Sequence, residues 1–138
     1  MWVGPPQIVR QMIIDLTISP QNGMIFITGD KCTELPDWQR GDTLRSNDSC
    51  ILMGTRPPCD GETRLTMTDD RQSPSGMTDL QRVFKGEVSV PTGEVQVFTV
   101  LLEPLAVVPV NSTECLVEVW VDDPQEPSRI WVRVGAQS

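Results

Sequence analysis

The stretch Leu116-Val-Glu-Val-Trp-Val121, followed by Ile130-Trp-Val-Arg-Val134, determines how the end of this chain pairs. In both runs, aliphatic residues alternate with polar or aromatic ones at a period of two, which is typical of a strand that buries one face. Residues 122–129 between them are polar and contain Pro124 and Pro127, which indicates a connecting loop. We therefore expect an antiparallel hairpin in which Val121 lies opposite Ile130.

This register also pairs the side chains that face away from the valines. Trp120 lies opposite Trp131, and Glu118 lies opposite Arg133, giving an aromatic pair and an opposite-charge pair. A slip of one residue would move every valine to the polar face. The alternation therefore specifies the register strongly.

Short strands and turns account for the rest of the chain. Runs that are alternating or short and apolar occupy residues 12–19, 24–28, 50–53, 63–67, 83–90, 94–102 and 105–108. The turn chemistry at Ser19-Pro-Gln-Asn-Gly23 predicts that the first two runs form a hairpin. Residues 29–48 are polar and irregular, and residues 69–79 read as a loop.

The fold predicted from these runs is all-β. About eight or nine short strands at this spacing are typical of a sandwich or barrel. No window shows a helical apolar stripe of useful length, and the twelve prolines favour turns and sheet edges. We predict one antiparallel β-sandwich domain over residues 1–138.

The charge of the chain limits its partners. The formal net charge is −8 and the pI is about 4.4. Nucleic-acid binders and anionic-membrane binders need a basic footprint, so neither class is expected. A basic protein partner fits, because complementary fields speed encounter. The alternative is that the acidic surface serves only solubility.

The four cysteines are Cys32, Cys50, Cys59 and Cys115. They form no Cys-x-x-Cys motif, so neither a zinc ribbon nor a thioredoxin-like site is expected. Whether Cys50 and Cys59 pair across a hairpin is left open by the sequence. No signal peptide is apparent, so we expect reduced thiols and a cytoplasmic protein.

The usual catalytic residue types are scarce. The chain has no histidine, which removes Ser-His-Asp and Cys-His chemistry, and it has no glycine-rich phosphate loop. Two carboxylate pairs, Asp69-Asp70 and Asp122-Asp123, leave open an acid–base enzyme. Asp122, Asp123 and Glu126 could bind calcium only weakly, because their loop lacks alternating oxygen ligands. We expect no cofactor, no metal and no enzymatic activity.

The outer face of the closing hairpin is either a binding surface or a face covered by the chain itself. Trp120 and Trp131 would form an anchor of the kind enriched at interface hot spots. Glu118 and Arg133 would form its polar rim, and the loop with Asp122, Asp123 and Glu126 would add acidic contacts. Alternatively, this face is covered by the chain itself, through the N-terminal arm (Trp2, Val3, Pro5, Pro6) or the loop carrying Trp38.

Several short motifs occur in an order that resembles the bacterial competence protein J family and related small β-sandwich proteins. They are Ile14-Asp-Leu-Thr-Ile-Ser19, Pro36-Asp-Trp38, Phe84-Lys-Gly86, Val88-Ser-Val-Pro91-x-Gly93, Val108-Pro-Val110 and Val119-Trp-Val121. The resemblance spans most of the chain and implies a non-enzymatic inhibitor of a DNA-degrading nuclease. It assigns no binding residue by position.

These observations favour an acidic, bacterial or phage binding protein that inhibits or neutralises a basic partner such as a nuclease or toxin, in the manner of an immunity protein. We expect a monomer or small homo-oligomer. A structural β-sandwich of a virion or tail and a carboxylate-based enzyme are the alternatives.

Overall fold

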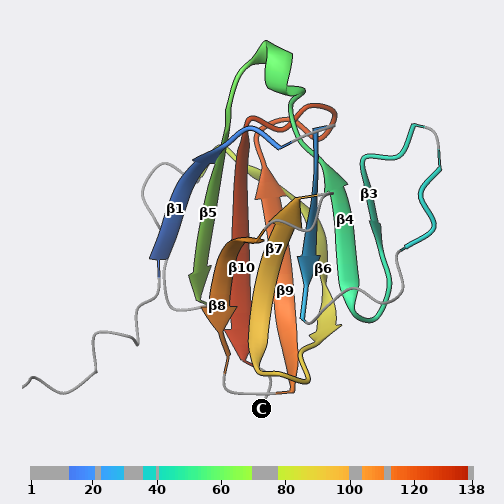
Figure 1. Ribbon diagram of the computed structural model, residues 1–138, viewed down its shortest axis with the longest axis vertical. Helices are drawn as coiled ribbons and strands as arrows, with labels where there is room; N and C mark the ends of the chain where they lie inside the picture. Colours follow the sequence, from blue (N-terminus) through green and yellow to red (C-terminus); the bar gives the residue numbers. More distant parts are fainter. Residues whose placement is uncertain are drawn as a thin grey trace, which may run out of the picture.

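The computed structural model describes residues 13–20, 23–29, 36–39, 41–69, 78–99, 104–110 and 113–136. Within these ranges the chain is all-β and forms two five-stranded sheets that lie face to face (Figure 1). This confirms the predicted sandwich. None of the helical segments in the described ranges has the length and apolar character needed to cross a membrane.

Sheet 1 has the spatial order β1 (Ile13–Ile18), β5 (Thr63–Asp69), β10 (Arg129–Ala136), β9 (Glu114–Val121), β6 (Gln81–Ser89). Sheet 2 has the order β3 (Leu44–Ser46), β4 (Cys50–Gly54), β2 (Met24–Thr28), β7 (Glu94–Thr99), β8 (Pro104–Pro109). A short 3-10 helix, η3 (Pro58–Asp60), precedes β5. Neighbouring strands are antiparallel except for β5 and β10, which run parallel, so the predicted antiparallel pairing fails at that one position.

The core lies between the two sheets, where the alternating aliphatic residues meet. Ile25, Ile27 and Met53 of sheet 2 are almost fully buried, as are Leu65 and Val119 of sheet 1. Burying one such side chain contributes about 1.5–3 kcal/mol relative to leaving it in water. The period-two pattern of the sequence is therefore the main source of the fold's stability.

The closing hairpin has the register that its sequence predicts. Val121 pairs with Ile130 and Trp120 pairs with Trp131. Glu118 is likewise opposite Arg133. The hairpin also lies at the centre of sheet 1, with β5 on one side and β6 on the other.

The predicted first hairpin is wrong, because β1 and β2 belong to different sheets. β1 pairs with β5, and β2 lies between β4 and β7. At the predicted turn, Gly23 donates its N–H to the Pro20 carbonyl and has a φ of 60°, and Gln21 and Asn22 lie outside the described residues. The carbonyl of Gly23 accepts the N–H of Thr55, and this hydrogen bond holds the chain where it passes from one sheet to the other. Alternation shows which residues point inward, but it does not choose a strand's neighbours.

The long polar segment contains a strand that was not predicted. β3 has only three residues and pairs with β4 at an edge of sheet 2. It is too short and polar to show a period. With it, the described residues form ten strands rather than eight or nine. Two predicted strands reach beyond the described ranges. Met12 of the predicted strand 12–19 and residues 100–102 of the predicted strand 94–102 lie outside them.

A smaller apolar cluster covers the outer face of sheet 2. Phe26, Cys50 and Leu52 form its buried part, and Trp38 packs against them. Trp38 is thus an anchor for its own loop on sheet 2, well removed from the hairpin tryptophans of sheet 1.

The cysteines do not form the pair that the sequence left open. Cys59 is a free, exposed thiol and Cys115 is a free, buried one, whereas Cys50 is disulfide-bonded. Burial raises the pKa of the Cys115 thiol to about 11. The expectation of reduced thiols is therefore wrong for Cys50.

Candidate functional site

The outer face of sheet 1 carries the predicted anchor. Strand register aligns Thr66, Trp131, Trp120 and Arg82 in one row across β5, β10, β9 and β6. The two indole rings stack with centroids 5.7 Å apart and planes 29° apart. The hairpin therefore brings the two tryptophans together as its sequence predicts.

The two tryptophans differ in exposure. Trp131 is only 7% exposed, and its Nε1–H donates to Oγ1 of Thr68 at 2.9 Å. Trp120 is partly exposed, and the guanidinium of Arg82 lies over its ring, 5.6 Å from the centroid. Its buried Nε1 has no acceptor within the described part of the chain. Only Trp120 can therefore offer further aromatic surface to a partner.

A nearly buried carboxylate holds the charged residues of this face together. Glu118 is 8% exposed, and its oxygens lie 3.0 Å from Arg82 and 3.5 Å from Arg133. Arg82 thus contacts both Glu118 and the ring of Trp120. The result is a packed layer of aromatic and ionic side chains rather than an open apolar patch.

Of the two ways in which the chain itself could cover this layer, only the one through Trp38 falls on described residues. Trp38 belongs to the cluster on sheet 2, so that part of its loop does not cover the tryptophan pair. Trp2, Val3, Pro5 and Pro6 of the N-terminal arm lie outside the described residues.

Asp122 shapes the loop between β9 and β10. Its Oδ1 accepts the backbone N–H groups of Asp123, Ser128 and Arg129 at 2.9, 3.0 and 3.1 Å, and its Oδ2 accepts the Ser128 hydroxyl. Burial alone would raise the pKa of Asp122. The hydrogen bonds from Ser128 and from the backbone outweigh burial, and the pKa lies below the usual 3.8.

The other two predicted acidic contacts point to solvent. Asp123 is exposed, and its Oδ1 accepts the N–H of Gln125 at 2.9 Å. Glu126 is also exposed. Both are therefore open to a partner, whereas the carboxylate of Asp122 is engaged inside its own loop.

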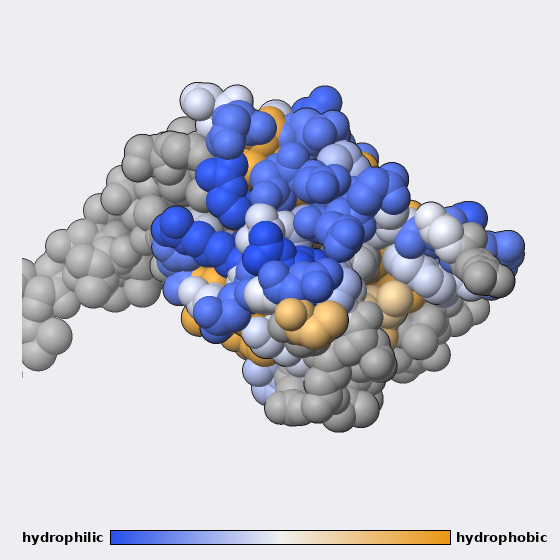
Figure 2. Space-filling model, turned by 90° about the horizontal axis from the view of Figure 1, so that it is seen from above, coloured by the Kyte–Doolittle hydropathy of each residue, from blue (hydrophilic) through white to orange (hydrophobic). Residues whose placement is uncertain are grey.

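Further carboxylates lie at the same end of the molecule. The backbone N–H of Arg56 donates to Pro127 and that of Arg64 donates to Ser128, which brings the segment around η3 against the hairpin loop. Asp79 reaches the loop base through an ion pair with Arg129. We call Asp60, Glu62, Asp79, Asp122, Asp123 and Glu126 the acidic end. Figure 2 looks onto this end and shows it to be largely hydrophilic.

Sequence reasoning missed Asp60, Glu62 and Asp79 as members of the acidic end, and Arg82 as the cation over Trp120. They come from segments far from the hairpin in the chain. Only knowledge that β5 and β6 flank β10 and β9 would place them there. No local pattern in the sequence carries that information.

The described residues do not assemble a metal centre. No group of three or more Asp, Glu, Cys or His side chains within them is arranged to hold an ion. Asp69 ends β5 at a partly buried position, and its predicted companion Asp70 lies outside the described residues.

Two solved structures share the fold of this chain. Neither the family models nor the curated proteins include a match. Among solved structures, ComJ from Bacillus subtilis, described as an inhibitor of the DNA-degrading activity of NucA, matches with a TM-score of 0.65 and 9% identity over 91% of this chain and 99% of ComJ. A protein described as crocagin biosynthetic gene J matches with a TM-score of 0.57 and 10% identity over 93% of this chain and 99% of that chain. The expected resemblance is thus confirmed, and at these identities what is shown is that the chain has the fold of these two proteins.

Proposed function

We propose that this protein is a non-enzymatic inhibitor that binds a basic partner, most simply a DNA-degrading nuclease. The observation that carries the proposal is the match to ComJ, which extends over 99% of that inhibitor. The likeness thus includes the whole sandwich rather than one shared hairpin.

Charge supports the same reading. A nuclease must hold a polyanion, so its DNA-binding face is basic. A protein of net charge −8 is attracted to such a face and competes with DNA for it. Within the acidic end, Asp60, Glu62, Asp123 and Glu126 are exposed. We therefore assign the contact surface to the acidic end.

The tryptophan layer then has a supporting role. Because Trp131 is 7% exposed, it can bury little further area against a partner. Its stack on Trp120 and its hydrogen bond to Thr68 stiffen the hairpin that carries the acidic loop. A stiff loop loses less conformational freedom on binding, which favours affinity.

The proposal is tested by adding the purified protein to an extract of its source cell and following the degradation of linear DNA. We expect a saturable loss of degradation that weakens as salt is raised, because salt screens the attraction between exposed charges. DNA degradation at its original rate with the protein in excess would contradict the proposal.

A matched pair of double variants tests the assignment to the acidic end. Asp123→Asn with Glu126→Gln removes two charges there, and Glu87→Gln with Glu94→Gln removes two charges from β6 and β7. We expect the first variant to need roughly tenfold more protein for equal inhibition. The second variant should behave like the original protein. Equal losses in both would mean that only net charge matters.

A further inference from the structure

Four strands lie at the edges of the two sheets, and three of them carry features that hinder pairing with another chain. β3 has only three residues. β8 begins and ends with a proline, which has no N–H to donate. β6 has a bulge between Arg82 and Phe84, and near its end Ser89 donates its N–H to the Asp48 carbonyl. Short length, proline, bulges and covered edges are the usual means of preventing edge-to-edge association.

β1 has none of these features. It pairs with β5 in unbroken register from Ile13 to Ile18, and no strand among the described residues pairs with its other side. Its six residues include neither proline nor lysine. The outer edge of β1 therefore offers backbone N–H and C=O groups to which a further strand can bond.

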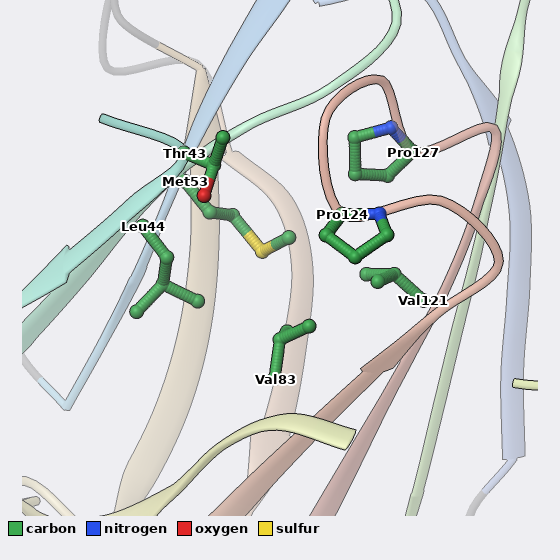
Figure 3. A pocket seen from close by; sticks show the side chains of 7 residues that line it. All are labelled: Thr43, Leu44, Met53, Val83, Val121, Pro124 and Pro127. Atoms are coloured by element: carbon green, nitrogen blue, oxygen red, sulfur yellow. The ribbon is translucent and has the colours of Figure 1, made fainter. Parts of the chain in front are cut away.

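The two sides of the sandwich differ in the apolar surface that they leave open. On the side of β3 and β6, the sheets leave a small apolar hollow with room for about one water molecule, lined by residues that include Leu44 and Val83 (Figure 3). On the side of β1 and β8 (Figure 1), Ile14, Leu16 and Leu105 pack against the core but stay partly exposed. The hollow is too small for a ligand, whereas the β1 side has apolar surface that a neighbouring strand can bury.

We infer that β1 pairs antiparallel with β1 of a second copy of this chain, about a two-fold axis at Leu16. Such a seam is self-complementary, so the sequence of one strand decides whether it fits. With the axis at Leu16, Ile14 lies opposite Ile18 of the second copy, and the apolar face continues across the seam. On the outer face, Asp15 lies opposite Thr17 of the second copy. An axis at Asp15 would instead set two carboxylates against each other.

The seam is small, and two copies of like charge must approach each other to form it. Six residues per copy bury less than a standard interface of about 1,600 Å², so we expect a weak dimer that forms at about 0.1 mM protein or above. Each copy has a net charge of −8, so raising salt should strengthen the dimer by screening the repulsion. The proposed complex with a basic partner should respond to salt in the opposite direction.

Two measurements on the whole chain test the inference. Sedimentation velocity over a series of protein and salt concentrations gives the dissociation constant of the dimer. Amide hydrogen exchange at low and high protein concentration shows which strand it uses. We expect reversible dimers that tighten with salt, and extra protection at high concentration in β1 but not in β3, β6 or β8.

Variants at Thr17 test the register. Thr17→Asp places a carboxylate opposite Asp15 of the second copy on both sides of the axis, and it should weaken the dimer about tenfold. Thr17→Asn is the neutral counterpart and should leave the dissociation constant unchanged. Val107→Asp adds the same charge to edge strand β8, where Val107 is 39% exposed, and it should have little effect.

Three results would overturn the inference. They are a chain that stays monomeric at about 1 mM in high salt, protection of β1 that does not change with protein concentration, and equal weakening by Thr17→Asp and Val107→Asp. The inference does not depend on the proposed function, and the two fail separately. A monomer that inhibits a nuclease retains only the proposed function, whereas a β1-linked dimer that inhibits none retains only the seam.

Discussion

Asp122 shows how one side chain can fix the shape of a loop. Its two oxygens accept from three backbone N–H groups and one hydroxyl, all in residues 123–129. An acidic residue beside a second one looks in sequence like a solvated or ligand-binding pair. The structure gives the two members different tasks, because Asp122 is engaged internally and Asp123 is exposed.

Stability should depend on the charge of Asp122 in acid. Its pKa is lowered in the folded state, so the stabilisation is fully present above the unfolded-state value near 3.8 and is lost as pH falls through the folded value. We expect Asp122→Ala to cost about 1–3 kcal/mol at pH 7, because three backbone N–H groups and one hydroxyl, most of them partly buried, lose their acceptor. The cost should shrink below pH 4. Urea unfolding followed by tryptophan fluorescence measures both values.

Asp123→Ala is the comparison at the neighbouring position. It removes one exposed acceptor and should cost less than about 1 kcal/mol at pH 7. Equal costs for the two variants at pH 7 would show that the hydrogen bonds accepted by Asp122 are not what stabilises this loop.

At the scale of strands, the sequence predicts faces well and neighbours poorly. The period-two pattern correctly gives the inward residues and the β9–β10 register, because both strands are joined by a short loop. It fails for β1 and β2, whose partners come from distant parts of the chain. For the same reason, the sequence does not predict that Thr68 contacts Trp131 or that Arg82 contacts Trp120. The pairing of the two tryptophans was predictable, and the residues that contact them were not.

Close approach of β2 and β6 at one end of the sandwich predicts a sharp difference between two glycines. A Cβ on Gly29 would collide with the backbone oxygen of Ser89, whereas a Cβ on Gly54 would meet its nearest atom, the Gly23 oxygen, at 3.7 Å. The backbone of Ser89 cannot move aside for the new methyl group as a flexible side chain could. We expect Gly29→Ala to destabilise by about 3 kcal/mol or more, at the upper end of overpacking effects.

Gly54→Ala is the control for this prediction. The position has ordinary van der Waals room, and alanine loses less conformational freedom than glycine on folding, so stability should stay the same or rise by up to about 1 kcal/mol. The midpoint of urea unfolding compares the two variants. A tolerated Gly29→Ala would mean that the backbones of Gly29 and Ser89 lie further apart than this close contact.

At the scale of the whole molecule, the net charge of −8 and the gathering of carboxylates at one end act together. Composition alone predicts the sign of the charge that a partner should carry. It does not predict the end to which the proposed partner would bind, because Asp60, Glu62 and Asp79 reach the hairpin loop only through the order of strands in sheet 1. The long-range field and the local contact surface are therefore different properties of the same carboxylates.

This difference predicts how salt should act on the complex with the proposed basic partner. Exposed charges attract over about 10 Å at 0.1 M salt and about 3 Å at 1 M, so raising salt should slow association by tenfold or more. Dissociation should change much less, because it depends on contacts already made within the interface. Surface plasmon resonance over a series of salt concentrations separates the two rates. If salt instead acts mainly on dissociation, the carboxylates of the acidic end work as short-range contacts, and steering by the net charge is not how this protein finds its partner.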